Sequence, residues 1–350
     1  MKICIIGTTG VPSSYGGFET LVENLIEDQS VDFFVYCSGK HFSDRLEHYK
    51  GAKLVYIPLK ANGLSSIFYD IFCMSHALFS GHKNFLILGI SGAIFFPILK
   101  FFPKIKLITN VDGIEWRRDK WKGIAKAFLK FSELLAVKFS NIIISDNKEI
   151  ENYFLEKYDH KSVTIAYGGD HAVKSFMNFE PNKIEDSSFA LSICRIEPEN
   201  NIHTILEAFS NNEYPITIIG NWNSNNYGKK LYSKYNSIKN ITLLNPIYSL
   251  NDLYRYRVAC SVYIHGHSSG GTNPSLVEMM YFSKPIIAFD CSFNRASMEN
   301  KGDYFDCESK LSKLVNNIEN LCEGSILYEI AQRRYNWNLI RKQYLEVFEL

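Results

Sequence analysis

Residues 2–26 read KICIIGTTGVPSSYGGFETLVENLI, and this stretch predicts the first unit of an α/β fold. A short apolar run at residues 2–7, closed by a glycine, is typical of a buried parallel strand. The apolar side chains that follow recur at the spacing of one helix face: Phe18, Leu21, Val22, Leu25 and Ile26. A glycine-bearing loop therefore joins a strand to a helix.

The same alternation of strand and helix continues along the chain. We expect strands at residues 33–37, 54–57, 85–90, 105–109, 141–145, 163–167, 189–194, 216–219, 241–244, 261–264 and 285–289, with helices at 202–209 and 274–282 among those between them. A polar stretch at 178–188, which contains Pro181, interrupts the pattern and predicts an interdomain linker. The fold class is therefore α/β, with two Rossmann-like domains facing across a cleft that binds ligand at the carboxyl ends of the strands.

Composition narrows the class of function. Of the 350 residues, 46% are hydrophobic and 21% charged, which is ordinary for a globular protein, and the formal net charge of +1 gives no overall attraction for nucleic acid. The eight cysteines are scattered without a CxxC pair, so we expect no zinc. The amino terminus runs directly into a strand, which predicts no signal peptide, reduced thiols and a cytoplasmic location. The apolar run at 85–99 is too short to span a bilayer, which needs about 20 residues.

The first loop has features of a phosphate site. Gly16 and Gly17 leave backbone amides uncovered at a helix start, where they can hold phosphate oxygens, although a plain tight turn is the alternative. A dinucleotide-binding GxGxxG motif is absent, because Gly7 and Gly10 are three residues apart and Ser13 occupies the next position. The second strand also ends without the acidic residue that binds a ribose. These observations disfavour a dehydrogenase.

The second motif, YIHGHSSGGTNPSLVE at residues 263–278, is the more specific. Asn273 is a good N-cap and Pro274 suits the first helical position, so free amides should face a ligand there. The glycines allow a diphosphate to come close. Glu278 lies one turn further along, where it can accept hydrogen bonds from sugar hydroxyls; the alternative is a solvated or salt-bridged helix residue.

Taken together, the motifs resemble glycosyltransferase family 4, which has the two-domain GT-B fold, and within it the bacterial rhamnosyltransferases of capsule and O-antigen synthesis. The resemblance covers essentially the whole chain and rests on YGGFET at 15–20, NVDGIEW at 110–116, YGGD at 167–170, CRIEPENN at 194–201, GNW at 220–222 and residues 265–278. It implies an acceptor-side domain of residues 1–180 plus a terminal helix at about 332–350. The nucleotide-sugar domain would be residues 186–331.

The resemblance implies catalytic roles for Asp112, Arg195 and Glu278. It also assigns donor contacts to Gly16, Gly17, Arg195, Gly220, Asn221, His265, Gly270, Gly271, Thr272, Asn273 and Glu278. Acceptor contacts are assigned to Phe18, Glu19, Asp112, Glu115 and Arg117. A guanidinium such as that of Arg195 stays charged and grips phosphate oxygens in pairs.

Alternatives and departures accompany these assignments. Arg195 could instead be a surface charge paired with Glu197 or Glu199, and Asp112 could belong to a simple turn. Many members of the family carry a phosphate-binding lysine where this chain has Asn200. The family's other glutamate, eight residues before Glu278, is replaced by Gly270. The donor sugar must then be held in another way.

The implied reaction retains anomeric configuration, with the departing phosphate taking the acceptor proton, and uses neither cofactor nor metal. His265 and His267 could coordinate a metal, but we expect them to hydrogen-bond. The donor would be dTDP-rhamnose, or a UDP- or GDP-sugar, and the acceptor a saccharide on undecaprenyl diphosphate. Two other classes remain open: a GT-B sugar-nucleotide epimerase, and a non-catalytic subunit that binds sugar nucleotides.

A basic and aromatic segment lies at residues 116–138, with seven basic and two acidic side chains. Such a helix can lie on an anionic bilayer and predicts peripheral contact with the inner face of the plasma membrane. The alternative is a solvated helix whose aromatic side chains belong to the core.

Overall fold

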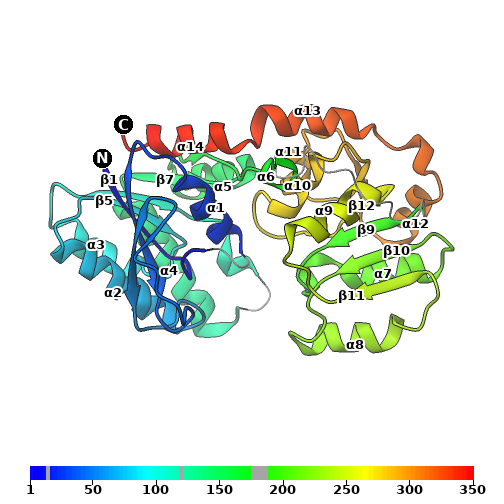
Figure 1. Ribbon diagram of the computed structural model, residues 1–350, viewed down its shortest axis with the longest axis horizontal. Helices are drawn as coiled ribbons and strands as arrows, with labels where there is room; N and C mark the ends of the chain where they lie inside the picture. The colour runs from blue at the N-terminus through cyan, green and yellow to red at the C-terminus, as the bar shows by residue number, and fades with distance from the viewer. Residues whose placement is uncertain (13–15, 119–120, 175–187) are drawn as a thin grey trace. The chain divides into compact units, whose positions relative to one another are not determined.

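The computed structural model describes residues 1–12, 16–118, 121–174 and 188–350, which form two compact units (Figure 1). Unit 1 comprises Met1–Ala166 and Trp337–Leu350, and unit 2 comprises Tyr167–Asn336. The expected boundary at residues 180–186 lies outside the described residues, whereas residues 167–174, which we had assigned to the first domain, pack with unit 2. Both units are α/β and built on parallel sheets, so the predicted fold class is confirmed.

Unit 1 is built on an eight-stranded sheet in the order β3-β4-β2-β1-β5-β6-β7-β8. Its strands are β1 (Lys2–Ile6), β2 (Asp32–Ser38), β3 (His48–Tyr49), β4 (Ala52–Ile57), β5 (Asn84–Leu88), β6 (Lys106–Asn110), β7 (Ile142–Ser145) and β8 (Val163–Thr164). Only β3, which the sequence did not predict, runs antiparallel to its neighbour β4. The strand expected at 163–167 has just two residues, because the chain leaves the sheet after Thr164.

The helices of unit 1 follow these strands. They are α1 (Gly17–Leu25), α2 (Ser65–Phe79), the 3-10 turn η1 (Ala93–Phe95), α3 (Phe96–Leu99), the 3-10 turn η2 (Glu115–Arg117), α4 (Gly123–Phe139), α5 (Lys148–Tyr158) and α14 (Trp337–Glu346). The apolar run at 85–99 forms β5, a turn and short helices, as predicted. Within the described residues, no helix combines the length and apolar character needed to cross a membrane.

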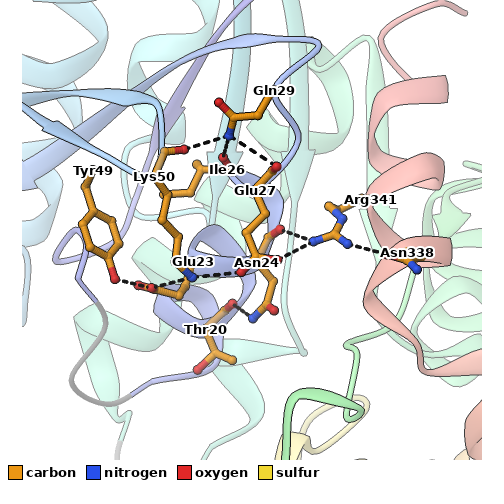
Figure 2. Close-up of polar contacts among 10 residues, drawn as sticks. All are labelled: Thr20, Glu23, Asn24, Ile26, Glu27, Gln29, Tyr49, Lys50, Asn338 and Arg341. Carbon is orange, nitrogen blue, oxygen red and sulfur yellow. Dashed lines mark hydrogen bonds and ion pairs between the residues drawn. The ribbon is translucent and has the colours of Figure 1, made fainter. Parts of the chain in front are cut away.

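Helix α14 is tied to α1 by charged contacts, although the two are at opposite ends of the sequence (Figure 2). Arg341 donates hydrogen bonds to the carbonyl oxygen of Asn24 at 3.1 Å and to the carboxylate of Glu27 at 2.7 Å. Lys50 then pairs with Glu27 at 2.9 Å and with Glu23 at 3.0 Å. The last helix therefore belongs to the packing of unit 1.

Unit 2 is built on a six-stranded parallel sheet in the order β11-β10-β9-β12-β13-β14. The strands are β9 (Ala190–Ile193), β10 (Ile216–Ile219), β11 (Ile241–Leu244), β12 (Val262–His265), β13 (Ile286–Phe289) and β14 (Asp303–Phe305). The helices are α6 (His171–Lys174), α7 (Ile202–Ser210), α8 (Asn226–Tyr235), α9 (Leu250–Ala259), α10 (Pro274–Met280), α11 (Ser292–Ser297), α12 (Glu308–Val315) and α13 (Gly324–Arg334), with 3-10 turns η3 (Pro198–Asn200) and η4 (Ile318–Asn320).

In unit 2, the chain adds strands first on one side of β9 and then on the other. From β9 the chain adds β10 and β11 on one side, and then returns to add β12, β13 and β14 on the other. Such a reversal leaves a crevice at the carboxyl ends of the two strands that flank it, here β9 and β12, and α/β proteins bind ligands there.

Candidate functional site

The loops that follow β9, β10 and β12 meet at this reversal in unit 2. Arg195 lies two residues beyond β9, Gly220 and Asn221 directly follow β10, and residues 266–273 directly follow β12. These three strands are neighbours in the sheet, so their carboxyl ends share one edge. The structure therefore brings together the residues that the sequence assigned to the donor in this half of the chain.

Hydrogen bonds tie the loop after β9 to the loop after β12. The side-chain amide of Asn200 donates to the carbonyl oxygen of Arg195 at 2.7 Å, and its oxygen accepts from Nδ1 of His267 at 2.8 Å. The backbone N–H of Ser268 donates to the carbonyl oxygen of Glu199 at 2.9 Å. Asn200, at 3% exposed, thus fixes the backbone around Arg195.

Two glycines of the second motif are required by the backbone. A Cβ atom at Gly266 would stand 2.0 Å from the carbonyl oxygen of Asn200, which excludes any side chain there. Gly270 has a φ of +109°, a conformation that residues with side chains rarely adopt. A glutamate at position 270 would therefore be strained in this backbone conformation.

Arg195 presents an exposed guanidinium at the same edge. In the part of the chain that the structure describes, no ion pair joins it to Glu197 or Glu199, the partners considered in the alternative interpretation. Asn200 fixes the backbone of Arg195 through a hydrogen bond to its carbonyl oxygen, while the Arg195 side chain is exposed. It is the one feature of this edge best suited to meet a phosphate.

Helix α10 begins as the sequence predicts. The side-chain oxygen of Asn273 accepts from the backbone N–H of Ser275 at 3.0 Å and from its hydroxyl at 2.8 Å, and Pro274 occupies the first turn. The helix ends at Met280 rather than at residue 282. Thr272, just before the cap, is buried, whereas Gly271 is partly exposed.

Glu278 forms a charge cluster with two residues of unit 2. One carboxylate oxygen accepts from the guanidinium of Arg257, and the other lies 3.3 Å from Nε2 of His171. Burial raises the pKa of this carboxyl, but the attraction of Arg257 and the hydrogen bond with His171 outweigh it and lower the pKa to about 2. Glu278 is thus ionised at neutral pH, and a carboxylate has about four lone-pair sites, so capacity to accept from a ligand remains.

Arg257 is a residue that sequence reasoning missed. It lies in α9, is only 2% exposed, and is matched by the Glu278 carboxylate on α10. Its side chain carries no recognisable motif signal, because α9 also holds the half-exposed Arg255 and only the packing distinguishes the two. The alternative prediction, that Glu278 is a salt-bridged helix residue, is therefore correct for the carboxylate oxygen that pairs with Arg257.

His265 is buried at the end of β12, and burial lowers its pKa to about 3, so the imidazole is neutral. Its Nε2 has no hydrogen-bond partner within the structure. Among the described residues, no cluster of three or more His, Cys, Asp or Glu side chains could hold a metal ion, and the histidine pair at 265 and 267 does not form one.

In unit 1, Asp112 follows β6 and adopts a left-handed conformation with a φ of 59°. Its backbone N–H donates to the side-chain oxygen of Asn110 at 2.8 Å, and the amide of Asn110 donates to the hydroxyl of Tyr344 at 2.5 Å. Tyr344 belongs to α14 and is buried. The last helix of the chain therefore holds the turn that carries Asp112, a support that sequence reasoning did not identify.

The first loop contributes a second feature of unit 1. Gly16 caps α1 with a φ of +134°, so the helix begins where the glycine pair predicted. Glu19, a predicted acceptor contact, accepts hydrogen bonds from the backbone N–H of Thr9 at 2.9 Å and from the Thr9 hydroxyl at 2.8 Å. The half-buried Phe18 packs beside Gly89, at the end of β5. Tyr15 lies outside the described residues.

The remaining acceptor candidates also have internal partners. Glu115 pairs with Arg118 at 3.0 Å and accepts from the indole of Trp121 at 2.8 Å. The guanidinium of Arg117 lies over the ring of Trp116, 5.4 Å from its centre. These contacts show that the segment after β6 is a folded polar cluster and not an open loop.

A buried glutamate organises the basic segment. Glu133 of α4 accepts hydrogen bonds from Trp116, Tyr153, Lys157 and Tyr158. Trp116 also has the amino groups of Lys126 and Lys130 over its ring, at 5.6 and 4.5 Å from its centre. The sequence analysis counted Glu133 as one of the two acidic residues of this segment, and in the structure its side chain is buried.

Comparison with known proteins agrees with this architecture. Residues 173–335 match the family model of group 1 glycosyl transferases, and residues 1–170 match a domain family described as of unknown function (DUF1972). No curated protein matches the chain significantly.

Solved structures share the fold over the full length. A sucrose-phosphate synthase from Thermosynechococcus elongatus is 14% identical, with 99% of this chain and 98% of that chain covered and a TM-score of 0.78. HepE from Anabaena, solved with UDP and glucose, is 15% identical, with 100% and 99% covered and a TM-score of 0.74. A glycosyltransferase from Rickettsia africae is 13% identical, with 99% and 97% covered and a TM-score of 0.76. The chain therefore has the GT-B glycosyltransferase fold, with a group 1 glycosyltransferase domain at residues 173–335.

Proposed function

We propose that this protein is a retaining, metal-independent glycosyltransferase that moves rhamnose from dTDP-rhamnose to a saccharide on undecaprenyl diphosphate, in O-antigen or capsule synthesis at the inner face of the plasma membrane. The observation that carries the proposal is that Arg195 and the loop after β12 share one edge of the unit 2 sheet, and that this loop leads into α10, the helix that carries Glu278. That edge lies inside the group 1 glycosyltransferase match.

A nucleoside diphosphate suits the chemistry of this edge. The exposed guanidinium of Arg195 offers paired donors to phosphate oxygens, and Gly270, which has no side chain, lies in the neighbouring loop at 266–273. The HepE structures hold UDP or UDP-glucose, which supports a nucleotide-sugar donor for this chain as well.

Each residue then has a chemical task. Arg195 stabilises the charge that grows on the diphosphate as the glycosidic bond breaks. Glu278, kept ionised by Arg257, accepts hydrogen bonds from the ribose hydroxyls of the donor. Asp112 orients the acceptor hydroxyl, whose proton passes to the departing phosphate on the same face of the sugar. No protein nucleophile is consumed.

The assignment of rhamnose as the donor sugar and of a lipid-linked acceptor is based on the resemblance of the sequence motifs to those of rhamnosyltransferases. The donor sugar should be bound without a glutamate at position 270, because the backbone conformation of Gly270 disfavours the glutamate that the resemblance implies for other family members. A 6-deoxyhexose lacks one hydroxyl of an ordinary hexose, so it needs fewer polar partners in the pocket.

The test is to incubate the full chain with a panel of nucleotide sugars and a membrane extract that contains the lipid-linked acceptor. We expect release of the nucleoside diphosphate and transfer of label to lipid with dTDP-rhamnose, at a rate well above that with UDP-glucose or GDP-mannose. A chelator should leave the rate unchanged.

Two controls separate the other classes. Without acceptor, an epimerase would still convert the donor, whereas a transferase would leave its sugar stereochemistry intact. A chain that binds donor but transfers to no acceptor would be a binding subunit and would refute the proposal.

A further inference from the structure

Helix α2 of unit 1 exposes a line of apolar side chains. Leu64, Phe68, Phe72 and Phe79 are all exposed, and their spacing places them on one side of the helix. The opposite side is buried and carries Tyr69, Cys73, Met74 and Ala77. A helix that buries one side in this way usually turns polar residues outward, so the exposed phenylalanines require an explanation.

The next elements show the same feature. Ile94 of η1, Ile98 of α3, and Phe101 and Phe102 directly after α3 are exposed. On α4 the exposed apolar residues are Ile124, Phe131 and Leu134. The most exposed side chains of the three regions are Phe79 at 88%, Phe101 at 81% and Ile124 at 90%.

These elements are neighbours within unit 1. A Cβ atom at Gly92, which precedes η1, would stand 2.5 Å from Cβ of Asp70 on α2, and the hydroxyl of Ser91 donates to the Asp70 carboxylate at 2.5 Å. Both η1 and α3 contact α4. We call the exposed apolar side chains of α2, η1, α3, the segment 101–102 and α4 the apolar face.

Among the described residues of α2, η1, α3, the segment 101–102 and α4, the exposed charged side chains are all basic. Residues 71–111 contain no Asp or Glu at all. Glu133, the single acidic residue of α4, is buried with its own partners. The exposed basic residues that accompany the face are Lys104, Lys122, Lys130 and Lys138.

We propose that the apolar face is a docking surface for an anionic lipid bilayer. The exposed aromatic and aliphatic side chains would enter the boundary between headgroups and acyl chains, and the lysines would contact anionic headgroups. So many exposed apolar side chains on neighbouring elements are uncommon on a protein that stays in water. Lysine stems can lie along the apolar surface while their amino groups reach the headgroups.

A second copy of the chain fits the same surface poorly. In a two-fold dimer the same patch meets itself, so the lysines of one copy would approach those of the other. Like charges across an interface oppose association, and no acidic residue of the face is available to balance them. Charge complementarity therefore selects the anionic bilayer.

The proposed membrane-binding surface includes α2, η1 and α3 in addition to the basic segment at 116–138. It rests on the proposed function in one respect: a lipid-linked acceptor gives the protein a reason to bind a membrane. Binding is therefore measured without donor or acceptor. Membrane binding can therefore be assessed even if sugar transfer fails, and sugar transfer can be assessed even if membrane binding fails.

The experiment is flotation of the purified full chain with phosphatidylcholine vesicles, with and without phosphatidylglycerol. We expect binding to the anionic vesicles that falls as salt rises. The triple variant Phe79→Ser, Phe101→Ser, Ile124→Ser should weaken it at least about tenfold, because it removes the most exposed apolar group of each region. The charge reversals Lys122→Glu, Lys130→Glu and Lys138→Glu, combined, should abolish the preference for anionic vesicles.

The matched control is the triple variant Leu250→Ser, Ile326→Ser, Leu350→Ser, which replaces exposed apolar side chains elsewhere and should bind like the parent. Circular dichroism must show that all variants fold. Absence of binding by the parent, or equal binding by both triple variants, would overturn the proposal. So would a parent that forms dimers in sedimentation, loses them on removal of Phe79, Phe101 and Ile124, and ignores vesicles.

Discussion

The two units hold their candidate residues by different physical means. In unit 2, loops after neighbouring strands are tied to each other through Asn200, and Glu278 is locked in its ionised form by the buried Arg257. In unit 1, the turn at Asp112 is held by neutral hydrogen bonds that lead through Asn110 to Tyr344. Unit 2 therefore holds Glu278 by a charge pair, whereas unit 1 holds the turn at Asp112 by neutral hydrogen bonds.

The largest effect should come from breaking the charge pair of unit 2. Glu278→Ala leaves Arg257 buried without its counter-charge, which we expect to lower the free energy of unfolding by about 3–5 kcal/mol. Urea denaturation measures this change. Transferase turnover should also fall by at least about 100-fold because a donor contact is lost.

A double variant separates the two roles of Glu278. Replacing both partners, as Glu278→Leu with Arg257→Met, should recover most of the stability because no unpaired charge remains. Activity should stay low. Recovery of activity along with stability would show that Glu278 acts only on the fold.

Removal of Arg195 should damage activity without damaging the fold. We expect Arg195→Ala to reduce kcat by about 100-fold to 1,000-fold, as loss of one transition-state donor does elsewhere. The guanidinium is exposed, so the free energy of unfolding should change by less than about 0.5 kcal/mol. Arg195→Lys keeps the positive charge but cannot donate a pair of hydrogen bonds, so its kcat should lie between that of the parent and that of Arg195→Ala. Parent-like turnover by Arg195→Ala would contradict the site.

The pH dependence of stability offers a sharper comparison between the units. The pKa of Glu278 is about 2 in the folded state, below its usual value of 4.5. A lowered pKa means that the stabilisation is complete above about pH 4.5 and is lost as the pH falls toward 2. Its size is on the order of 3 kcal/mol, by the conversion of a pKa shift to free energy.

Urea midpoints measured between pH 6 and pH 2, a range that covers this window, test the assignment. The variant Glu278→Gln should show a shallower decline than the parent over the same range. An identical decline in both would mean that other carboxylates account for the acid sensitivity.

The smallest effect is expected in unit 1. Tyr344→Phe removes the hydroxyl that accepts from Asn110, which should cost about 1 kcal/mol of stability. Loosening of the Asp112 turn should reduce turnover by roughly threefold to tenfold. Calorimetry should show unchanged affinity for the nucleotide, since the donor residues of unit 2 are untouched. A weakened nucleotide affinity would show that the two units do not divide the task in this way.

The sequence predicts most strands because their apolar runs are continuous and end at turn residues. The strands at 216–219 and 241–244 have the predicted bounds, whereas β3 and β14 are too short to show a period. The place of Arg195 and of the loop after β12 follows from strand adjacency. Arg257, His171 and Tyr344 could not be predicted in their roles, because each reaches its partner from a distant element and no local pattern marks the contact.

Unit 1 is assembled from both ends of the chain, and this has a consequence for biosynthesis. While residues 167–336 are being translated, on the order of ten to thirty seconds at typical rates, the first unit lacks the helix that supplies Tyr344 and Arg341. Its polypeptide leaves the ribosome with the surface of α1 still uncovered. The final fourteen residues thus complete the earliest part of the chain to emerge, so a stop codon near position 336 would disable the half that was made first.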